Sequence, residues 1–473
     1  MDEKQISYKE MLRRLMIEEV PSYANKFLYS LGFLSMTSLV LLLVTGVIMV
    51  FFGPDWWFTD KAGVFTRSLH LWSVQALVIL VILHGTIVFF TSGFKAPRQL
   101  TWVIGVLMFF FILMEAEFGY VLRDDFSSQW RSLQGADLYN GSGLGRFLNN
   151  LNYAQIYGIH IVFIPFILLG LIFLHYLFIK MRGIAKPYRK DLAYHMVKAN
   201  HTVLFIRGIA LVLLLIVLAI VFPSPLLQPY TIKSVAENDP GLIARTFLSE
   251  INHSSDTATY MDTIDPYAVF DTKIVYVDKP YQQALMVTGA KNMLIVFNKE
   301  QSALQTKQIK EAGDYYDKGG KITTSEKSKN PLIPVTGTLV LMAQSGLYEG
   351  ALRSQVSKIY DPTYVTRFLA DTGILEDQAT KLGITTPQYG MLREEKGEIP
   401  PGAWWLAPLG FMDNTILQND DNQDRDGAII LGTFLILGLA FPYIPGLNRF
   451  PEPFRLYRLI WRDKETEKKE KTS

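Results

Sequence analysis

The sequence predicts an all-α transmembrane protein with six membrane-spanning helices and a polar domain inserted between the fifth and the sixth. Of its 473 residues, 49% are hydrophobic and only 19% are charged, which is too apolar for an ordinary soluble protein. Apolar stretches of the ~20 residues that cross a bilayer recur along the chain. A long polar stretch, residues 223–426, interrupts them near the C-terminal end.

Composition also excludes several classes of function. The formal net charge of +2 gives no indication of a nucleic-acid partner. The chain has no cysteine. It therefore cannot form a disulfide, ligate an iron–sulfur cluster through thiolates or attach a c-type haem through thioethers.

The hydropathy pattern divides the chain into seven segments. The first four spans are expected at residues 27–52, 66–90, 102–122 and 157–180. The segments are an amphipathic N-terminal surface helix (1–26), a four-helix bundle (27–180), a basic loop (181–202), a fifth span (203–222), the inserted domain (223–426), a sixth span (427–446) and a charged tail (447–473).

Lysine and arginine predict the orientation. They cluster in the N-terminal segment, in the loops after the second and fourth spans, and in the C-terminal tail. Six spans put all four of these regions on one side, which the positive-inside rule makes cytoplasmic. Both termini are then cytoplasmic and residues 223–426 are extracytoplasmic.

The inserted domain is expected to have an α+β fold. Short apolar runs rich in β-branched residues, at 274–277 and 293–297, are typical of strands. Residues 241–251 and 348–359 are expected to be helical.

Four histidines lie in two of the spans with matched spacing. His70 and His84 are 14 residues apart in the second span, and His160 and His175 are 15 apart in the fourth. Both steps come close to four helical turns, so each pair shares one helix face with a rise of about 21–23 Å. Two such helices running in the same direction would bring His70 opposite His160 near the outer surface and His84 opposite His175 near the inner surface.

Opposed neutral imidazoles are good axial ligands for haem iron, so the pattern predicts two haem b groups stacked across the membrane. The alternative is that the histidines are hydrogen-bonded packing residues. Histidine within a membrane span is rare, and four at matched spacing favour the ligand interpretation.

Glycines repeat the same interval on the first and third spans. Gly32 and Gly46 are 14 residues apart, as are Gly105 and Gly119. Glycine allows a flat macrocycle to approach a helix backbone, so Gly46 and Gly119 are expected at the outer haem, and Gly32 and Gly105 at the inner. Helix packing alone is the alternative. Arg67, one turn before His70, could pair with a haem propionate or serve as an interfacial anchor.

These residues resemble the cytochrome b of quinol-oxidising cytochrome bc complexes, most closely the chloroplast-type branch in which cytochrome b is split into two subunits. The resemblance covers about residues 20–185. It rests on Arg67-Ser-Leu-His70-Leu-Trp-Ser73, Ile82-Leu-His84, Ser92-Gly-Phe-Lys-Ala-Pro-Arg98, Leu100-Thr-Trp102, Gly105, Gly119-Tyr-Val-Leu122, Trp130, His160, Pro165 and His175. The second subunit of that branch has a weaker counterpart in this chain: the fifth and sixth spans are similar to its first two helices, and residues 448–455 to the segment that follows them. The third helix of that subunit has no counterpart in this sequence.

The resemblance implies a function and partners. It implies an oxidoreductase subunit in a bacterial cytoplasmic membrane, with the four histidines as ligands of two b haems and quinol or quinone as substrate. It further implies a Rieske-type iron–sulfur subunit or a c-type cytochrome subunit as partner, within a homodimeric complex.

The outer quinol site departs from the family pattern. Where the family has Pro-Glu-Trp-Tyr, this chain has Gly402-Ala403-Trp404-Trp405, within the loop 400–410. The aromatic pair Trp404 and Trp405 is kept, but Ala403 replaces a carboxylate that could accept a proton from quinol. Glu395 or Glu398 could substitute. The alternatives are therefore a bifurcating quinol oxidase, a linear dihaem conduit between quinone and an outer partner, and a non-catalytic scaffold.

Overall fold

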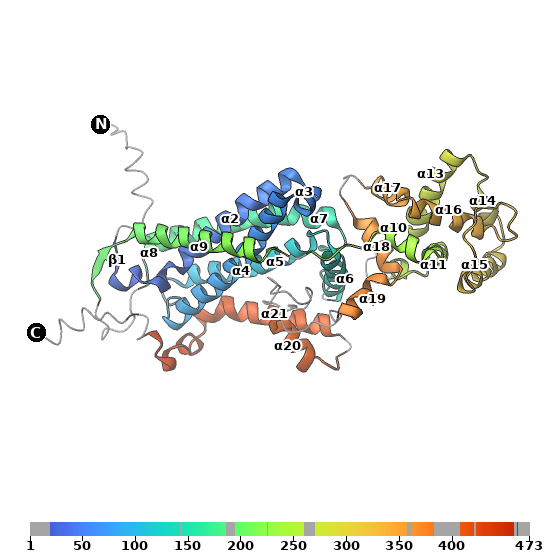
Figure 1. Ribbon diagram of the computed structural model, residues 1–473. Coiled ribbons are helices and arrows are strands. Elements are labelled where there is room, and N and C mark those ends of the chain that lie inside the picture. Colours follow the sequence, from blue (N-terminus) through green and yellow to red (C-terminus); the bar gives the residue numbers. More distant parts are fainter. Residues whose placement is uncertain are drawn as a thin grey trace, which may run out of the picture.

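The protein is an elongated helical molecule with a membrane bundle at one end and the inserted domain at the other (Figure 1). The computed structural model describes residues 19–141, 143–185, 194–224, 226–259, 270–356, 361–382, 407–420, 422–457 and 461. Within these residues, six helices are long and apolar enough to cross a membrane.

The six candidate spans fall where hydropathy placed them. They are built from α2 (Leu31–Phe52), α4 (Lys61–Phe90), α5 (Gln99–Val121), the continuous run of α7 (Tyr153–Gly158), η3 (Ile159–Phe163) and α8 (Ile164–Arg182), α9 (His201–Val221) and α21 (Gln423–Ala440). Helix α2 packs along α4, α5 packs along α8, and α9 and α21 lie against opposite parts of this bundle.

Local sequence defines where α4 begins. The side chain of Asp60 accepts hydrogen bonds from the backbone N–H groups of Ala62, at 2.8 Å, and Gly63, at 3.3 Å. The preceding helix α3 (Pro54–Thr59) packs so tightly that a Cβ on Gly63 would lie 2.1 Å from the carbonyl oxygen of Trp56. The cap and the glycine together allow the connection after α2 to fold back on α4.

The regions expected on one side of the membrane do meet at one end of the bundle. A short antiparallel pair joins β1 (Glu19–Pro21) to β2 (Met196–Lys198). Tyr23 donates to the carbonyl of Ala185 at 2.7 Å, and the indole of Trp461 donates to the hydroxyl of Tyr29 at 2.7 Å. The N-terminal segment, the loop after the fourth span and the C-terminal segment therefore share one small core.

The surface helix predicted for residues 1–26 is wrong at its C-terminal end. Residues 1–18 lie outside the described part of the chain, but Glu19–Pro21 form β1 and Ser22–Asn25 form the 3-10 turn η1. The residue before a proline is disfavoured in the α region, and Pro21 has no N–H to donate within a helix. The chain is therefore extended at this point.

Within the described residues, every regular element of the inserted domain is a helix, so the α+β fold expected for it is wrong there. It contains α10 (Ile232–Asn238), α11 (Pro240–Ile251), η4 (Ile274–Asp278), α13 (Lys279–Thr288), α14 (Met293–Asn298), α15 (Ser302–Asp317), α16 (Leu332–Gln344), α17 (Leu347–Arg353), α18 (Thr363–Asp371), α19 (Ile374–Leu382) and α20 (Ala407–Thr415). The predicted helices at 241–251 and, as far as Arg353, at 348–359 are confirmed.

Capping explains why one of the two apolar runs expected as strands is helical. The Asn292 side chain accepts hydrogen bonds from Leu294 N–H at 3.1 Å and Ile295 N–H at 3.3 Å, which begins α14. The other run, η4, is a π turn that ends two residues before Pro280. Tertiary burial and these local signals outweigh the β propensity of the short runs.

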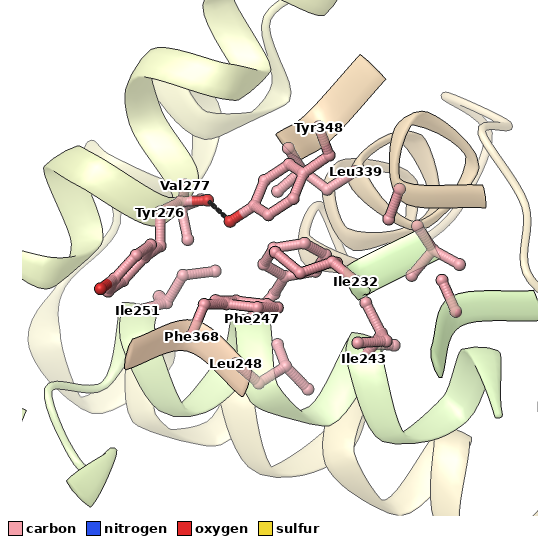
Figure 2. Close-up of a cluster of buried hydrophobic side chains, with 14 of the residues drawn as sticks. Ile232, Ile243, Phe247, Leu248, Ile251, Tyr276, Val277, Leu339, Tyr348 and Phe368 are labelled. Atoms are coloured by element: carbon pink, nitrogen blue, oxygen red, sulfur yellow. Dashed lines mark hydrogen bonds between the residues drawn. The ribbon is translucent and has the colours of Figure 1, made fainter. Parts of the chain in front are cut away.

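Aromatic rings fill the core of the inserted domain (Figure 2). Phe247, Tyr276, Tyr348 and Phe368 are fully buried there, and the Tyr348 hydroxyl donates to the Tyr276 carbonyl at 2.8 Å. Helix α6 (Phe126–Gly141), which follows the third span, contributes Phe126 to the same core. The inserted domain is thus joined to the bundle through this connection as well as through its own chain ends.

Candidate functional site

At the level near the inserted domain, two histidine rings face two glycines. His70 comes from α4 and faces α2, where a Cβ on Gly46 would lie 3.4 Å from its Cε1 atom. His160 comes from η3 and faces α5, where a Cβ on Gly119 would lie 2.9 Å from its Cε1 atom. This is the outer level of the candidate site.

The inner level repeats the arrangement. A Cβ on Gly32 of α2 would lie 3.3 Å from Cε1 of His84, and a Cβ on Gly105 of α5 would lie 3.7 Å from Cε1 of His175. The structure therefore places each of the four histidines beside the glycine expected at its level, on helices that pack in pairs, α2 with α4 and α5 with the run of η3 and α8.

A π turn reconciles the unequal histidine spacings. An α-helix advances about 100° per residue, so 14 residues fall about 40° short of four turns, while 15 residues pass four turns by about 60°. His160 lies in η3, and a π turn takes up one extra residue. Pro165, two residues beyond η3, lacks the N–H that would continue the α-helical ladder there. The longer step thus returns to one helix face.

Hydrogen bonds at the outer level fix the protonation of both rings. Thr45 Oγ1 donates to the Leu41 carbonyl at 2.7 Å, so it accepts from Nδ1–H of His70, 2.8 Å away. His160 Nδ1 lies 3.1 Å from the Glu115 carbonyl oxygen and 3.2 Å from Glu115 Oε1, both of which are acceptors. The proton is therefore on Nδ1 in each ring, which leaves the Nε2 lone pair available to a metal.

Arg67 is held at the outer end of α4 by contacts within the protein. It is 8% exposed, its Nη2 donates to the Ser224 carbonyl at 2.8 Å, and its guanidinium lies 5.8 Å from the centre of the Phe58 ring. It lies one turn from His70, as expected, and is oriented by the chain that leaves α9. Its pairing with a propionate stays a prediction.

Hydrogen bonds between Asp125 and Ser128, in the loop after the third span, define where α6 begins. Asp125 Oδ1 accepts from the backbone N–H of Ser128 at 2.9 Å, and Ser128 Oγ accepts from the backbone N–H of Asp125 at 3.0 Å. Arg123 pairs with the buried Asp125 at 2.9 Å. These two hydrogen bonds form a reciprocal cap at the start of α6, the helix that contributes Phe126 to the core of the inserted domain.

A small polar cavity lies where this loop meets the inserted domain. Asp124, Gln129, Asn150 and Thr363 are among its lining residues. Burial raises the pKa of Asp124 to about 6, and the positive charge of Arg353 partly opposes this shift. The outer end of the bundle therefore holds a carboxyl group that changes protonation near neutral pH.

The basic residues at the inner end have protein partners. Arg98 donates to the carbonyl oxygens of Arg182, at 2.9 Å, and Ile184, at 3.1 Å, and Lys95 pairs with Glu452. These contacts tie the loop after the second span to the loop after the fourth span and to the C-terminal segment. The candidate quinol residues Glu398, Trp404 and Trp405 lie outside the described residues.

Four histidines at two levels, carried by two membrane helices, are typical of membrane cytochromes that bind haem between their helices. The chain matches the family described as cytochrome b(N-terminal)/b6/petB over residues 75–229. It is 30% identical over 190 residues to a cytochrome b6 of Heliobacterium modesticaldum, covering 36% of this chain and 89% of the relative.

Two further proteins show similarity. The chain is 25% identical over 214 residues to a menaquinol:cytochrome c reductase cytochrome b subunit of Bacillus subtilis, covering 39% of this chain and 96% of the relative. A solved structure, a hyperthermophilic respiratory Complex III, aligns with a TM-score of 0.39 and 15% identity, over 78% of this chain and 98% of that one. The chain belongs to the cytochrome b family of bc-type complexes.

Haem b is the cofactor that the family implies, and the residues present fit it. Neutral imidazoles with Nδ1 fixed by hydrogen bonds are suitable axial ligands. The glycine backbones beside each ring leave the space that a side chain would otherwise fill. The glycine clearance is found at both levels, and among the described residues the Nδ1 hydrogen bonds are found at the outer level.

Sequence analysis missed three contributors to the site: Thr45, Glu115 and the π turn. Thr45 gave no signal, because a threonine in an apolar span is common. Glu115 did give one, since an ionisable residue within a span is rare. The π turn could have been inferred from the 15-residue step together with Pro165.

Proposed function

We propose that this chain is the dihaem cytochrome b subunit of a membrane quinol:cytochrome c-type oxidoreductase, carrying electrons between two b haems and coupling quinol oxidation to proton translocation. The observation that carries the proposal is the alignment of the histidine pairs with the glycines at two levels. His70 and His160 would hold the outer haem, and His84 and His175 the inner.

The residues of the chain provide binding, orientation and exclusion of water. Haem iron, when bound, supplies reversible one-electron chemistry. Thr45 and Glu115 hold the outer rings by Nδ1, so that Nε2 of each ring would be available to the iron, and the apolar faces of α2, α4, α5 and α8 would keep water away from both levels. Arg67 would balance the charge of an outer propionate.

We place the inserted domain and the quinol site on the extracytoplasmic side. The basic segments gather at the opposite end of the bundle, which the positive-inside rule assigns to the cytoplasm of a bacterial inner membrane. From the sequence we assign Trp404 and Trp405 to the quinol site, and Glu398 as the proton acceptor in place of the family carboxylate. A Rieske-type iron–sulfur subunit or a c-type cytochrome subunit receives one electron, within a homodimeric complex.

A linear conduit is the second candidate function, and the replacement of the family carboxylate by Ala403 favours it. In that case both electrons of quinol would follow one route, and the outer site would not divide them. The dihaem bundle would be the same in the two functions, so only a kinetic experiment separates them.

The test is an oxidant pulse on membranes that contain the assembled complex. Quinol is supplied with the inner quinone site inhibited, and the absorption of the b haems is followed after the pulse. Transient haem reduction on addition of oxidant is the expected result, because it requires that the two electrons separate at the outer site. Haem oxidation alone would overturn bifurcation and establish the linear conduit.

A further inference from the structure

A carboxylate lies inside the membrane span α5, directly against one of the proposed outer haem ligands. Glu115 follows the apolar run from Val106 to Met114, and its side chain is 20% exposed; the other carboxylate of α5, Glu117, pairs with Arg131. An ionisable group at such a depth is costly unless a partner stabilises it. Glu115 is therefore expected to have a specific hydrogen-bonding or charged partner within the protein.

That partner is His160. Oε1 of Glu115 lies 3.2 Å from Nδ1 of His160, and the Glu115 backbone carbonyl lies 3.1 Å from the same nitrogen. Oε2 of Glu115 is buried and has no hydrogen-bond partner. One N–H group thus faces two acceptors of the same residue, a neutral carbonyl and a carboxylate.

The other outer ring has a different environment. Nδ1 of His70 faces the neutral hydroxyl of Thr45 at 2.8 Å. Within the described residues, the structure records a carboxylate partner for His160 but none for His70, His84 or His175. Among the described residues, His160 is therefore the one of the four histidines that has a carboxylate beside its ring.

We propose that Glu115 is a positioning residue that lowers the midpoint potential of the outer haem by sharing the Nδ1 proton of His160. This inference rests on the proposed function, since it assumes haem at the outer level. A carboxylate that accepts from a ligand imidazole raises the basicity of the coordinating Nε2. A more basic ligand and a nearby negative charge both favour ferric over ferrous iron. A lower outer potential would favour electron flow from the outer level towards the inner.

The backbone carbonyl makes the proposal testable by substitution. In E115Q and E115A, the Nδ1–H of His160 keeps the carbonyl acceptor at 3.1 Å, so its tautomer and its ability to bind iron are retained. E115Q removes the carboxylate charge and keeps the shape of the side chain, whereas E115A removes the charge together with the side chain beyond Cβ. E115D restores the charge on a shorter side chain. E117Q is the matched control, because Glu117 lies on the same helix but pairs with Arg131 instead of His160.

The experiment is a spectroelectrochemical titration of the b haems in membranes, with the ferric spin-resonance spectrum of the outer haem as a second readout. E115Q and E115A should raise the potential of one haem by a change of at least about tenfold in its ferric to ferrous ratio, which is about 59 mV for one electron. The second haem should not move, E115D should stay near the wild type, and E117Q should match it.

Several results would overturn the proposal. These are an unchanged titration in E115Q and E115A, equal shifts of both haems, or a shift in E115D as large as in E115Q. Loss of the outer haem in both E115Q and E115A, with retention in E115D, would assign Glu115 to assembly and not to the potential. A wild-type protein without two titrating haems would instead refute the proposed function itself.

Discussion

Two carboxyl groups inside the inserted domain make its stability depend on pH. Glu250, at the end of α11, is fully buried and accepts from the Ser255 hydroxyl at 2.8 Å. Burial, reinforced by the charge of Asp371, raises the pKa of Glu250 to about 9. Burial also raises the pKa of Asp371 to about 6, although its carboxylate accepts from the Thr257 N–H at 2.7 Å. The folded domain therefore holds a proton that the unfolded chain releases.

The sign and size of the effect follow from this proton. Below the ordinary pKa of a glutamate, about 4.5, Glu250 is protonated in both the folded and the unfolded chain, so its titration does not change the free energy of unfolding there. Between that value and about 9 the folded state binds more protons, so the free energy of unfolding falls as pH rises. One proton lowers the free energy of unfolding by at most roughly 3 kcal/mol between pH 6 and pH 8.

Hydrogen exchange on the full-length protein in detergent measures this slope. The opening free energies of amides in α11 and α18 are compared at pH 6 and pH 8, after correction for the intrinsic exchange rates. E250Q keeps a hydrogen-bonding side chain without an ionisable group, and it should flatten the slope by more than half. E237Q is the control, because Glu237 is exposed and lies in a weak surface pair with Lys233. A wild-type domain that becomes more stable towards pH 8, or an unchanged slope in E250Q, would refute the reasoning.

The remaining predictions concern single contacts. Thr45→Val removes the acceptor for the outer ring of α4 and should weaken retention of the outer haem about 10- to 100-fold, measured by haem loss to apomyoglobin. Gly119→Val should lower the haem content towards one per chain, because a Cβ at this position would already lie 2.9 Å from the ring of His160. Gly170→Val is the control and should leave the haem content unchanged, because no described atom lies within 4 Å of a Cβ at that position. Tyr348→Phe loses the hydrogen bond to the Tyr276 carbonyl and should lower the free energy of unfolding of the inserted domain by about 1–3 kcal/mol, measured by hydrogen exchange. A change below roughly 0.3 kcal/mol would contradict a buried hydrogen bond at this position.

The membrane part of the fold was predictable because a bilayer restricts the possible structures. A helix satisfies the backbone groups of a segment in lipid within that segment, so an uninterrupted apolar stretch of about 20 residues predicts a helix and its approximate limits. The first span, Phe27–Phe52, was predicted with the same limits that the structure gives. The histidine and glycine intervals, together with the alternating direction of the spans, predicted Gly32 at the level of His84, where the structure places it.

The inserted domain was less predictable because water imposes no such restriction. Short apolar runs such as 274–277 fit a strand or a buried helical turn equally well by periodicity. What decides between them is the surrounding structure, such as the Asn292 cap and the proline after η4. The contact of Glu115 with His160 depends on how α5 packs against η3, which no spacing within one span could reveal.

The pairing of the histidines is the central claim, and the haem content of double variants tests it most directly. Haem b is counted per chain by the pyridine haemochrome method in purified wild type, H70A/H160A and H70A/H84A. The account predicts two haems in the wild type, one in H70A/H160A, where both substitutions fall at one level, and none in H70A/H84A, where each level loses a ligand. Equal haem content in the two double variants would contradict the assignment of ligands to levels.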